Sequence, residues 1–241
     1  MNVAVFVEMV KEMSEKSIQV GWKWSNVKDL EYWQIPDGFI MNLPYRIGDP
    51  PARILDLGCG IGRHIVYFSS LGYQVTGMDI SEEAVTKTKE WLKKEGFTAD
   101  VKEGKMTKIE EIDDYFTLVI AYNVIYHAYK KDIIKTISEI YRVLKPGGFF
   151  FGTILTKDPN QPFYGSEGII DDQTLIKQEE PEKGIPHFFS YIEDILKFFK
   201  SFEIIDLFYN ECYSKPFTLE RINNKKGNGH YIIFAQKPKK Q

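Results

Sequence analysis

A glycine-rich turn between a predicted strand and a predicted helix places the strongest constraint on the fold. The apolar run at residues 53–57 is typical of a strand buried on both faces, and periodic apolar residues from 61 to 71 predict a helix. Gly58, Gly60 and Gly62 lie between the two, where the chain must reverse tightly. Glycine allows positive φ and leaves no Cβ between backbone and ligand. Because a helix N-terminus attracts anions, the turn predicts a site for a ligand that carries a carboxylate or another anionic group.

The residues around the turn indicate which cofactor it would hold. A dinucleotide-binding turn is expected to read G-x-G-x-x-G, and Arg63 occupies the position of its third glycine. A second predicted strand, residues 73–78, ends at Asp79, about 20 residues after the turn. At that spacing a carboxylate accepts hydrogen bonds from both hydroxyls of a ribose. An NAD-type oxidoreductase and a turn whose glycines serve packing alone stay open as alternatives.

Five segments resemble class I S-adenosylmethionine (SAM) dependent methyltransferases: ILDLGCGIGRH, MDIS, EGKMTKI, VIAYNVIYH and LKPGG, all within residues 50–155. The resemblance implies an α/β, Rossmann-like fold with helices on both faces of a seven-stranded, mostly parallel sheet. Its strand order would be 3-2-1-4-5-7-6, with strand 7 antiparallel. The implied activity is methyl transfer from SAM to an acceptor by in-line displacement, which leaves S-adenosylhomocysteine (SAH). A non-catalytic SAM-binding protein is the alternative within the same resemblance.

The resemblance also implies the cofactor-binding residues. The turn would lie at the methionine end, Asp79 at the ribose, and Ile80 and Met106 at the adenine, while Arg63 suits the SAM carboxylate. Many relatives carry an acid where this chain has Lys105, and a protonated lysine cannot accept a bond from the adenine amino group. A backbone carbonyl, Glu103 or water would then take that bond. The full expected set is Asp56, Gly58, Gly60, Arg63, Asp79, Ile80, Met106 and Asn123.

The segment after the predicted strand at residues 116–122 carries the catalytic candidates. Tyr126 and His127 are expected near the transferable methyl group, and neutral imidazole at His127 can take a proton from the acceptor. His127 also has a structural interpretation, in which its side chain caps the backbone groups at the start of the helix that follows. His187 has the same two interpretations, substrate contact or loop anchor. No spacing of cysteine, histidine and acidic residues predicts a metal site.

Strands and helices alternate after the turn, which predicts a mostly parallel sheet with right-handed crossovers. A helix at 191–200 and strands at 202–209 and 230–236, the last preceded by a turn at 226–229, suggest a closing antiparallel pair. We expect a methyltransferase domain over residues 51–241, with a substrate-side insertion at about 156–190. Residues 1–50 form an N-terminal helical and aromatic cover, whose tryptophans and tyrosines either shield hydrophobic surface or close the active site.

Composition and net charge narrow the choice of methyl acceptor. With 241 residues, 43% of them hydrophobic, the chain can bury a substantial core. A formal net charge of −3 gives no strong electrostatic case for nucleic acid as a partner. A small-molecule acceptor is therefore favoured, and the GIPHFFS element resembles tellurite-resistance and thiopurine type methyltransferases.

Cysteine usage and apolar runs bear on location. Cys59 and Cys212 predict no disulfide framework, and neither a membrane span nor a secretion signal is found, so a cytoplasmic monomer or homodimer is expected. The basic end that begins at Lys237 is expected to be a solvated tail.

Overall fold

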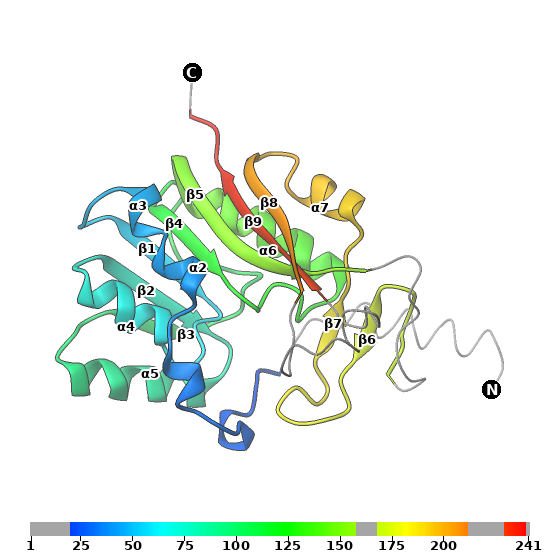
Figure 1. The fold of residues 1–241 in the computed structure, drawn as a ribbon, viewed down its shortest axis with the longest axis horizontal. Helices are drawn as coiled ribbons and strands as arrows, with labels where there is room; N and C mark the ends of the chain where they lie inside the picture. Colours follow the sequence, from blue (N-terminus) through cyan, green and yellow to red (C-terminus); the bar gives the residue numbers. More distant parts are fainter. Residues whose placement is uncertain (1–19, 158–167, 212–228, 240–241) are drawn as a thin grey trace, which may run out of the picture.

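The central sheet has seven strands in the order β3-β2-β1-β4-β5-β9-β8. The computed structural model describes residues 20–157, 168–211 and 229–239. Strands β1 to β5 are parallel, whereas β9 runs antiparallel to both neighbours. The predicted order, with an antiparallel last strand, is confirmed (Figure 1). The strands are β1 (Arg53–Leu57), β2 (Gln74–Asp79), β3 (Asp100–Glu103), β4 (Phe116–Ala121), β5 (Leu144–Leu155), β8 (Glu203–Glu211) and β9 (Gly229–Gln236).

Helices cover both faces of this sheet, because its inner strands are apolar on both sides. In β1, Ile54 packs in the same cluster as Ile65 of α4, while its neighbour Leu55 packs in the cluster that holds Ile137 of α6. Successive strand residues thus serve opposite faces. One face carries α2 (Gly38–Met41), α3 (Pro44–Ile47), α4 (Arg63–Ser70) and α5 (Glu82–Glu95), and the other carries α6 (Lys130–Val143) and α7 (Ile192–Phe198).

The predicted insertion contains a small second sheet. Strands β6 (Thr174–Ile176) and β7 (Pro186–Phe188) pair antiparallel and lie beside the main sheet in Figure 1. The amide of Phe188 donates to the carbonyl of Tyr126 at 2.9 Å, and that of Ser190 donates to Leu155 at 2.8 Å. These bonds hold the insertion against the loop that follows β4 and against the end of β5.

The LKPGG segment forms the start of β5 rather than a turn before it. Helix α6 ends at Val143, and Leu144 already pairs with Phe116 of β4. The register then shifts, and Gly147 adopts φ of +79°. Phe116 pairs with Leu144 and Leu118 pairs with Phe149, so β5 has three more residues than β4 between these pairs, and Gly147 accommodates the positive φ of this irregular stretch.

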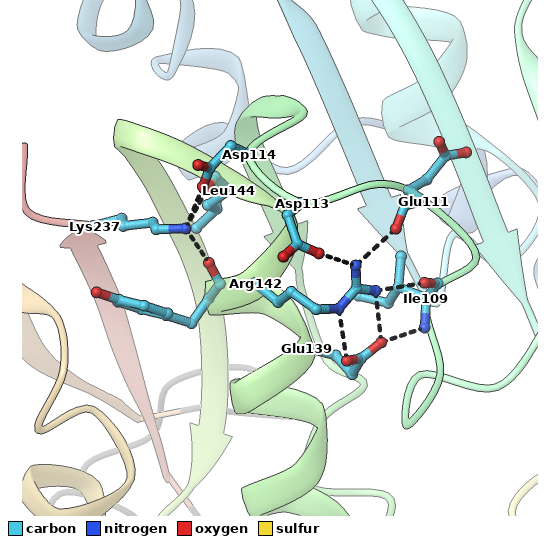
Figure 2. A network of polar contacts seen from close by, with 9 residues as sticks. Ile109, Glu111, Asp113, Asp114, Glu139, Arg142, Leu144 and Lys237 are labelled. Carbon is cyan, nitrogen blue, oxygen red and sulfur yellow. Dashed lines mark hydrogen bonds and ion pairs between the residues drawn. The ribbon is translucent and has the colours of Figure 1, made fainter. Parts of the chain in front are cut away.

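The prediction of a solvated tail is wrong for Lys237. This residue is buried, with 8% of its surface exposed. Its ammonium donates to Asp114 Oδ1 at 2.7 Å and to the carbonyls of Tyr141 and Leu144 at 2.8 and 2.7 Å. An ammonium has three N–H donors, so all three are satisfied. Figure 2 shows this contact beside the network of Arg142, which binds Glu139 and the loop before β4. The end of α6 is therefore fastened to β9.

Replacing Lys237 with methionine is expected to lower the free energy of unfolding by about 2 to 3 kcal/mol, because buried acceptors lose a charged donor. Urea unfolding at pH 7 measures this change. Lys239→Met is the control, since that lysine is exposed two residues further on. Equal midpoints for the two variants would contradict the structural role of Lys237.

The longest helices among the described residues, α5 and α6, have 14 residues each and carry many charged side chains. Within the described part of the chain, no helix has the length and apolar character that a membrane span requires.

Candidate cofactor and acceptor site

The turn after β1 needs glycine for both backbone and space. Gly58, Gly60 and Gly62 have φ of 71°, 54° and 94°, and Gly62 precedes the first residue of α4. A Cβ at Gly58 would lie 2.7 Å from Cβ of Val124, and one at Gly60 would lie 2.6 Å from the ring of Trp24. Larger residues would therefore both strain the backbone and clash.

Asp79 ends β2 directly beside this turn. Its Oδ2 accepts from the amide of Gly60 at 2.8 Å, and its Oδ1 accepts from the amide of Ser81 at 2.9 Å. Burial raises the pKa of Asp79, and the backbone amides oppose that effect. Each carboxylate oxygen has a second lone pair, so the group can still accept from the hydroxyls of a ribose. The donor set thus fits a nucleoside next to the glycine turn.

Most of the predicted site residues line one cavity at the carboxyl ends of β1, β2 and β4. Ligands in open α/β sheets bind at this edge. Asp56 and Tyr126 do not form part of its wall. The predicted residues in the wall are Gly58, Gly60, Arg63, Asp79, Ile80, Met106, Asn123 and His127.

Asp56 lies behind the turn, at 2% exposure, with its Oδ2 at 3.8 Å from Nδ1 of His64. Burial raises its pKa to about 7; Arg63 opposes the rise and Asp79 adds to it. Burial also lowers the pKa of His64 well below its usual value, with Arg63 acting in the same direction. Both groups therefore favour their neutral forms, and a positive charge in the cavity would favour ionised Asp56.

Tryptophans from the N-terminal segment close one side of the cavity. Trp22, Trp24 and Trp33 pack with ring centroids 5.1 to 5.9 Å apart, and all three line the wall. The buried indole N–H of Trp22 finds no acceptor among the described residues, so it is a donor that a ligand can use. Arg63 lies 5.3 Å over the ring of Trp33 and donates to the carbonyl of Ile35 at 3.4 Å. The aromatic segment and Arg63 therefore pack as one wall.

The adenine end of the expected site is formed by loop residues. Ile80, Lys105 and Met106 line the cavity, whereas Glu103 at the end of β3 does not. On the opposite side, Asn123 has φ of +60° and its amide donates to Oγ1 of Thr153 at 2.7 Å. The backbone N–H of Asn123 is therefore already bonded. Its backbone carbonyl is the group that could accept a hydrogen bond from the amine of the methionine part of SAM.

His127 lines the cavity, and its ring centroid lies 6.1 Å from that of Trp22. Its Nε2 lies 3.4 Å from Oε1 of Glu182, and Nε2 of His187 lies 3.3 Å from the same oxygen. Burial lowers the pKa of His127 to about 4, although the carboxylate of Glu182 opposes it. Burial acts to raise the pKa of Glu182, but the two histidines outweigh it and hold that pKa well below its usual range.

Tyr126 lies behind His127, with ring centroids 4.4 Å apart, and its hydroxyl is 3.2 Å from Nε2 of His230 on β9. Sequence reasoning missed Glu182 and His230. Glu182 lies in a polar, proline-containing stretch without periodicity, and His230 lies in an ordinary strand pattern. Neither position carries a local signal for a site.

Comparison with known proteins matches part of this chain to methyltransferases. Residues 54–148 match the family model of the methyltransferase domain. A putative methyltransferase of Bacillus subtilis, YqeM, is 32% identical over 130 residues, which is 53% of this chain and 50% of the relative. The chain spans between 29% and 50% of the first three relatives that it matches.

Solved structures share the fold at low identity. A SAM-dependent methyltransferase from Methanosarcina mazei has a TM-score of 0.68 at 19% identity, over 83% of this chain and 98% of that one. The 1,6-didemethyltoxoflavin N1-methyltransferase of Burkholderia thailandensis, with its substrate and SAH bound, has a TM-score of 0.60 at 16% identity, over 98% of this chain and 88% of that one.

The chain has the class I, Rossmann-like fold of SAM-dependent methyltransferases, and residues 54–148 are the part that matches the methyltransferase-domain model. The predicted resemblance is confirmed, and so is the prediction of SAM as the cofactor.

Proposed function

We propose that this protein transfers a methyl group from SAM to a small-molecule acceptor by in-line displacement, leaving SAH. The observation that carries the proposal is the placement of Asp79. Its carboxylate holds the glycine turn through Gly60 and faces the cavity that has His127 in its wall. A ribose-binding group and an acceptor-side group thus share one space.

The cofactor would be held mainly by backbone and by apolar faces. Asp79 takes the ribose hydroxyls, the bare turn at Gly58 and Gly60 takes the methionine part, and Ile80 and Met106 hold the adenine. Arg63, which lines the cavity, would pair with the SAM carboxylate. When bound, SAM supplies the activated methyl group and its own leaving group.

We assign residues 1–50 the role of a cover over residues 51–241; residues 1–19 of this segment lie outside the described residues. Support comes from the tryptophans in the cavity wall, since aromatic faces attract a sulfonium and exclude water. The insertion at 156–190 supplies Ile185 to the same wall and so contributes to the acceptor side.

Orientation would be the protein's main contribution to rate. Holding an acceptor atom in line with the methyl carbon is worth roughly 7 to 11 kcal/mol. His127 contacts the acceptor in this proposal. Tyr126 acts through it as a positioning residue, because it packs on His127 and lies outside the cavity wall. The wall of Trp22, His127 and Ile185 suits a compact, partly apolar molecule.

Methyl-labelled SAM and a panel of phenols, thiols, amines and heterocycles test this function. The expected result is label on at least one acceptor class, with one SAH formed per methyl transferred. SAM binding without transfer to any acceptor would favour the non-catalytic alternative. NADH binding without SAM binding would favour the oxidoreductase.

A further inference from the structure

Three side chains from two distant parts of the sequence converge beside the cofactor cavity. His127 follows β4, Glu182 lies between β6 and β7, and His187 lies in β7. Their ligand atoms all lie within 4.8 Å of one another. We propose that they bind one divalent transition-metal ion of the zinc type. Methyl transfer from SAM does not by itself require such a site.

The distances fit metal ligands better than hydrogen bonds. Nε2 of His127 and Nε2 of His187 lie 3.4 and 3.3 Å from Oε1 of Glu182. An N–H···O bond prefers about 2.7 to 3.2 Å, and Nε2 of His127 makes no hydrogen bond of normal geometry within the described residues. Zinc bonds of about 2.0 to 2.1 Å at tetrahedral angles separate neighbouring ligand atoms by about 3.3 to 3.4 Å. The spacing around Glu182 is therefore that of a tetrahedral edge.

A backbone carbonyl orients one histidine for this role. Nδ1 of His187 lies 3.2 Å from the carbonyl oxygen of Ile185. With the proton on Nδ1 donated to that carbonyl, Nε2 carries the lone pair that faces Glu182. Metal-binding histidines use their second nitrogen in this way.

Burial and charge around the cluster also suit a cation. The side chain of His187 is 4% exposed, that of His127 11% and that of Glu182 23%. A carboxylate held this far from water needs a compensating positive charge. Lys177 supplies one from 3.9 Å, but to Oε2, and its side chain is 40% exposed. Oε1, the oxygen nearest both histidines, is left for the ion.

Three protein ligands leave one position of a tetrahedral site open, as in zinc sites that act on a substrate. His127 lines the cofactor cavity, so a ligand can reach that position from the acceptor side. The open position would take an oxygen, nitrogen or sulfur atom of the acceptor and fix its direction.

Metal titration of the full chain tests the site without any methyl acceptor. After chelator treatment and dialysis, Zn²⁺ is added in a calorimeter and Co²⁺ in a spectrophotometer, where visible d–d bands report its coordination. We expect one ion per chain with a Kd of about 1 µM or tighter, and about 100-fold weaker binding in His187→Ala and Glu182→Gln.

Two matched variants act as controls. His230→Gln removes a neighbouring histidine whose Nε2 contacts Tyr126 instead, and it should leave the affinity unchanged. Lys177→Met removes the competing positive charge and should not weaken binding. If His187→Ala does not fold, the near-isosteric Glu182→Gln carries the test. Binding weaker than about 100 µM, or binding that both ligand variants leave unchanged, would overturn the site.

Discussion

Replacing Asp79 with alanine is expected to weaken SAH binding about 100-fold. Two hydrogen bonds from the ribose hydroxyls to a carboxylate are worth about 1.5 kcal/mol each, and the free energies add to about 3 kcal/mol. The substitution also removes the acceptor of the Gly60 amide and so loosens the turn. Calorimetry with SAH at pH 7.5 measures the loss.

Glu103→Ala is the matched control for this substitution. Glu103 pairs with Asp79 across β2 and β3, but it is exposed and lies outside the cavity wall. Its removal should leave SAH affinity unchanged within about twofold. Wild-type affinity in Asp79→Ala would remove that carboxylate from the cofactor site.

Asp56→Asn is expected to stabilise the ligand-free protein at pH 8 by about 2 to 4 kcal/mol. The pKa of Asp56 is about 7 in the fold against a reference of 3.8, so ionisation of this buried group above pH 7 costs roughly 4 kcal/mol. An amide at the same place avoids that cost, but its own burial offsets part of the gain. Urea unfolding at several pH values measures the difference.

The direction of the pH dependence follows from proton binding. Between about pH 4 and 7 the folded protein holds a proton on Asp56 that the unfolded chain has lost, so wild-type stability falls as pH rises through this window. The advantage of Asp56→Asn should therefore grow by about 2.5 kcal/mol from pH 5 to pH 8. Subtracting the two curves removes contributions that both proteins share. Asp49→Asn replaces an exposed carboxyl and is the control: its stability relative to wild type should not rise between pH 5 and pH 8. If the stability difference between Asp56→Asn and wild type is also independent of pH, Asp56 is not buried in its neutral form.

Local signals in the sequence were enough to predict the glycine turn and the acid beside it. Three closely spaced glycines after an apolar run require a tight turn, and an acid at the end of the next strand must lie beside it, because neighbouring parallel strands end at the same edge. The strand order was predicted from the resemblance alone. Alternating strands and helices do not say which strands become neighbours.

The contacts around His127 join segments that are distant in the sequence, and such contacts leave no local pattern. Glu182 reaches His127 only because β7 binds the backbone of Tyr126, and Lys237 is buried only because β9 ends beside the last turn of α6. Trp24 covers Gly60 across a long stretch of chain in the same way. The cytoplasmic location and the monomeric or homodimeric state stay predictions.

Calorimetric titration of the wild-type protein with SAH tests the central claim most directly. The account predicts one site per chain with a Kd of about 1 to 10 µM, a binding free energy of roughly 7 to 8 kcal/mol. The absence of binding to both SAH and SAM, in protein that unfolds cooperatively, would contradict the account.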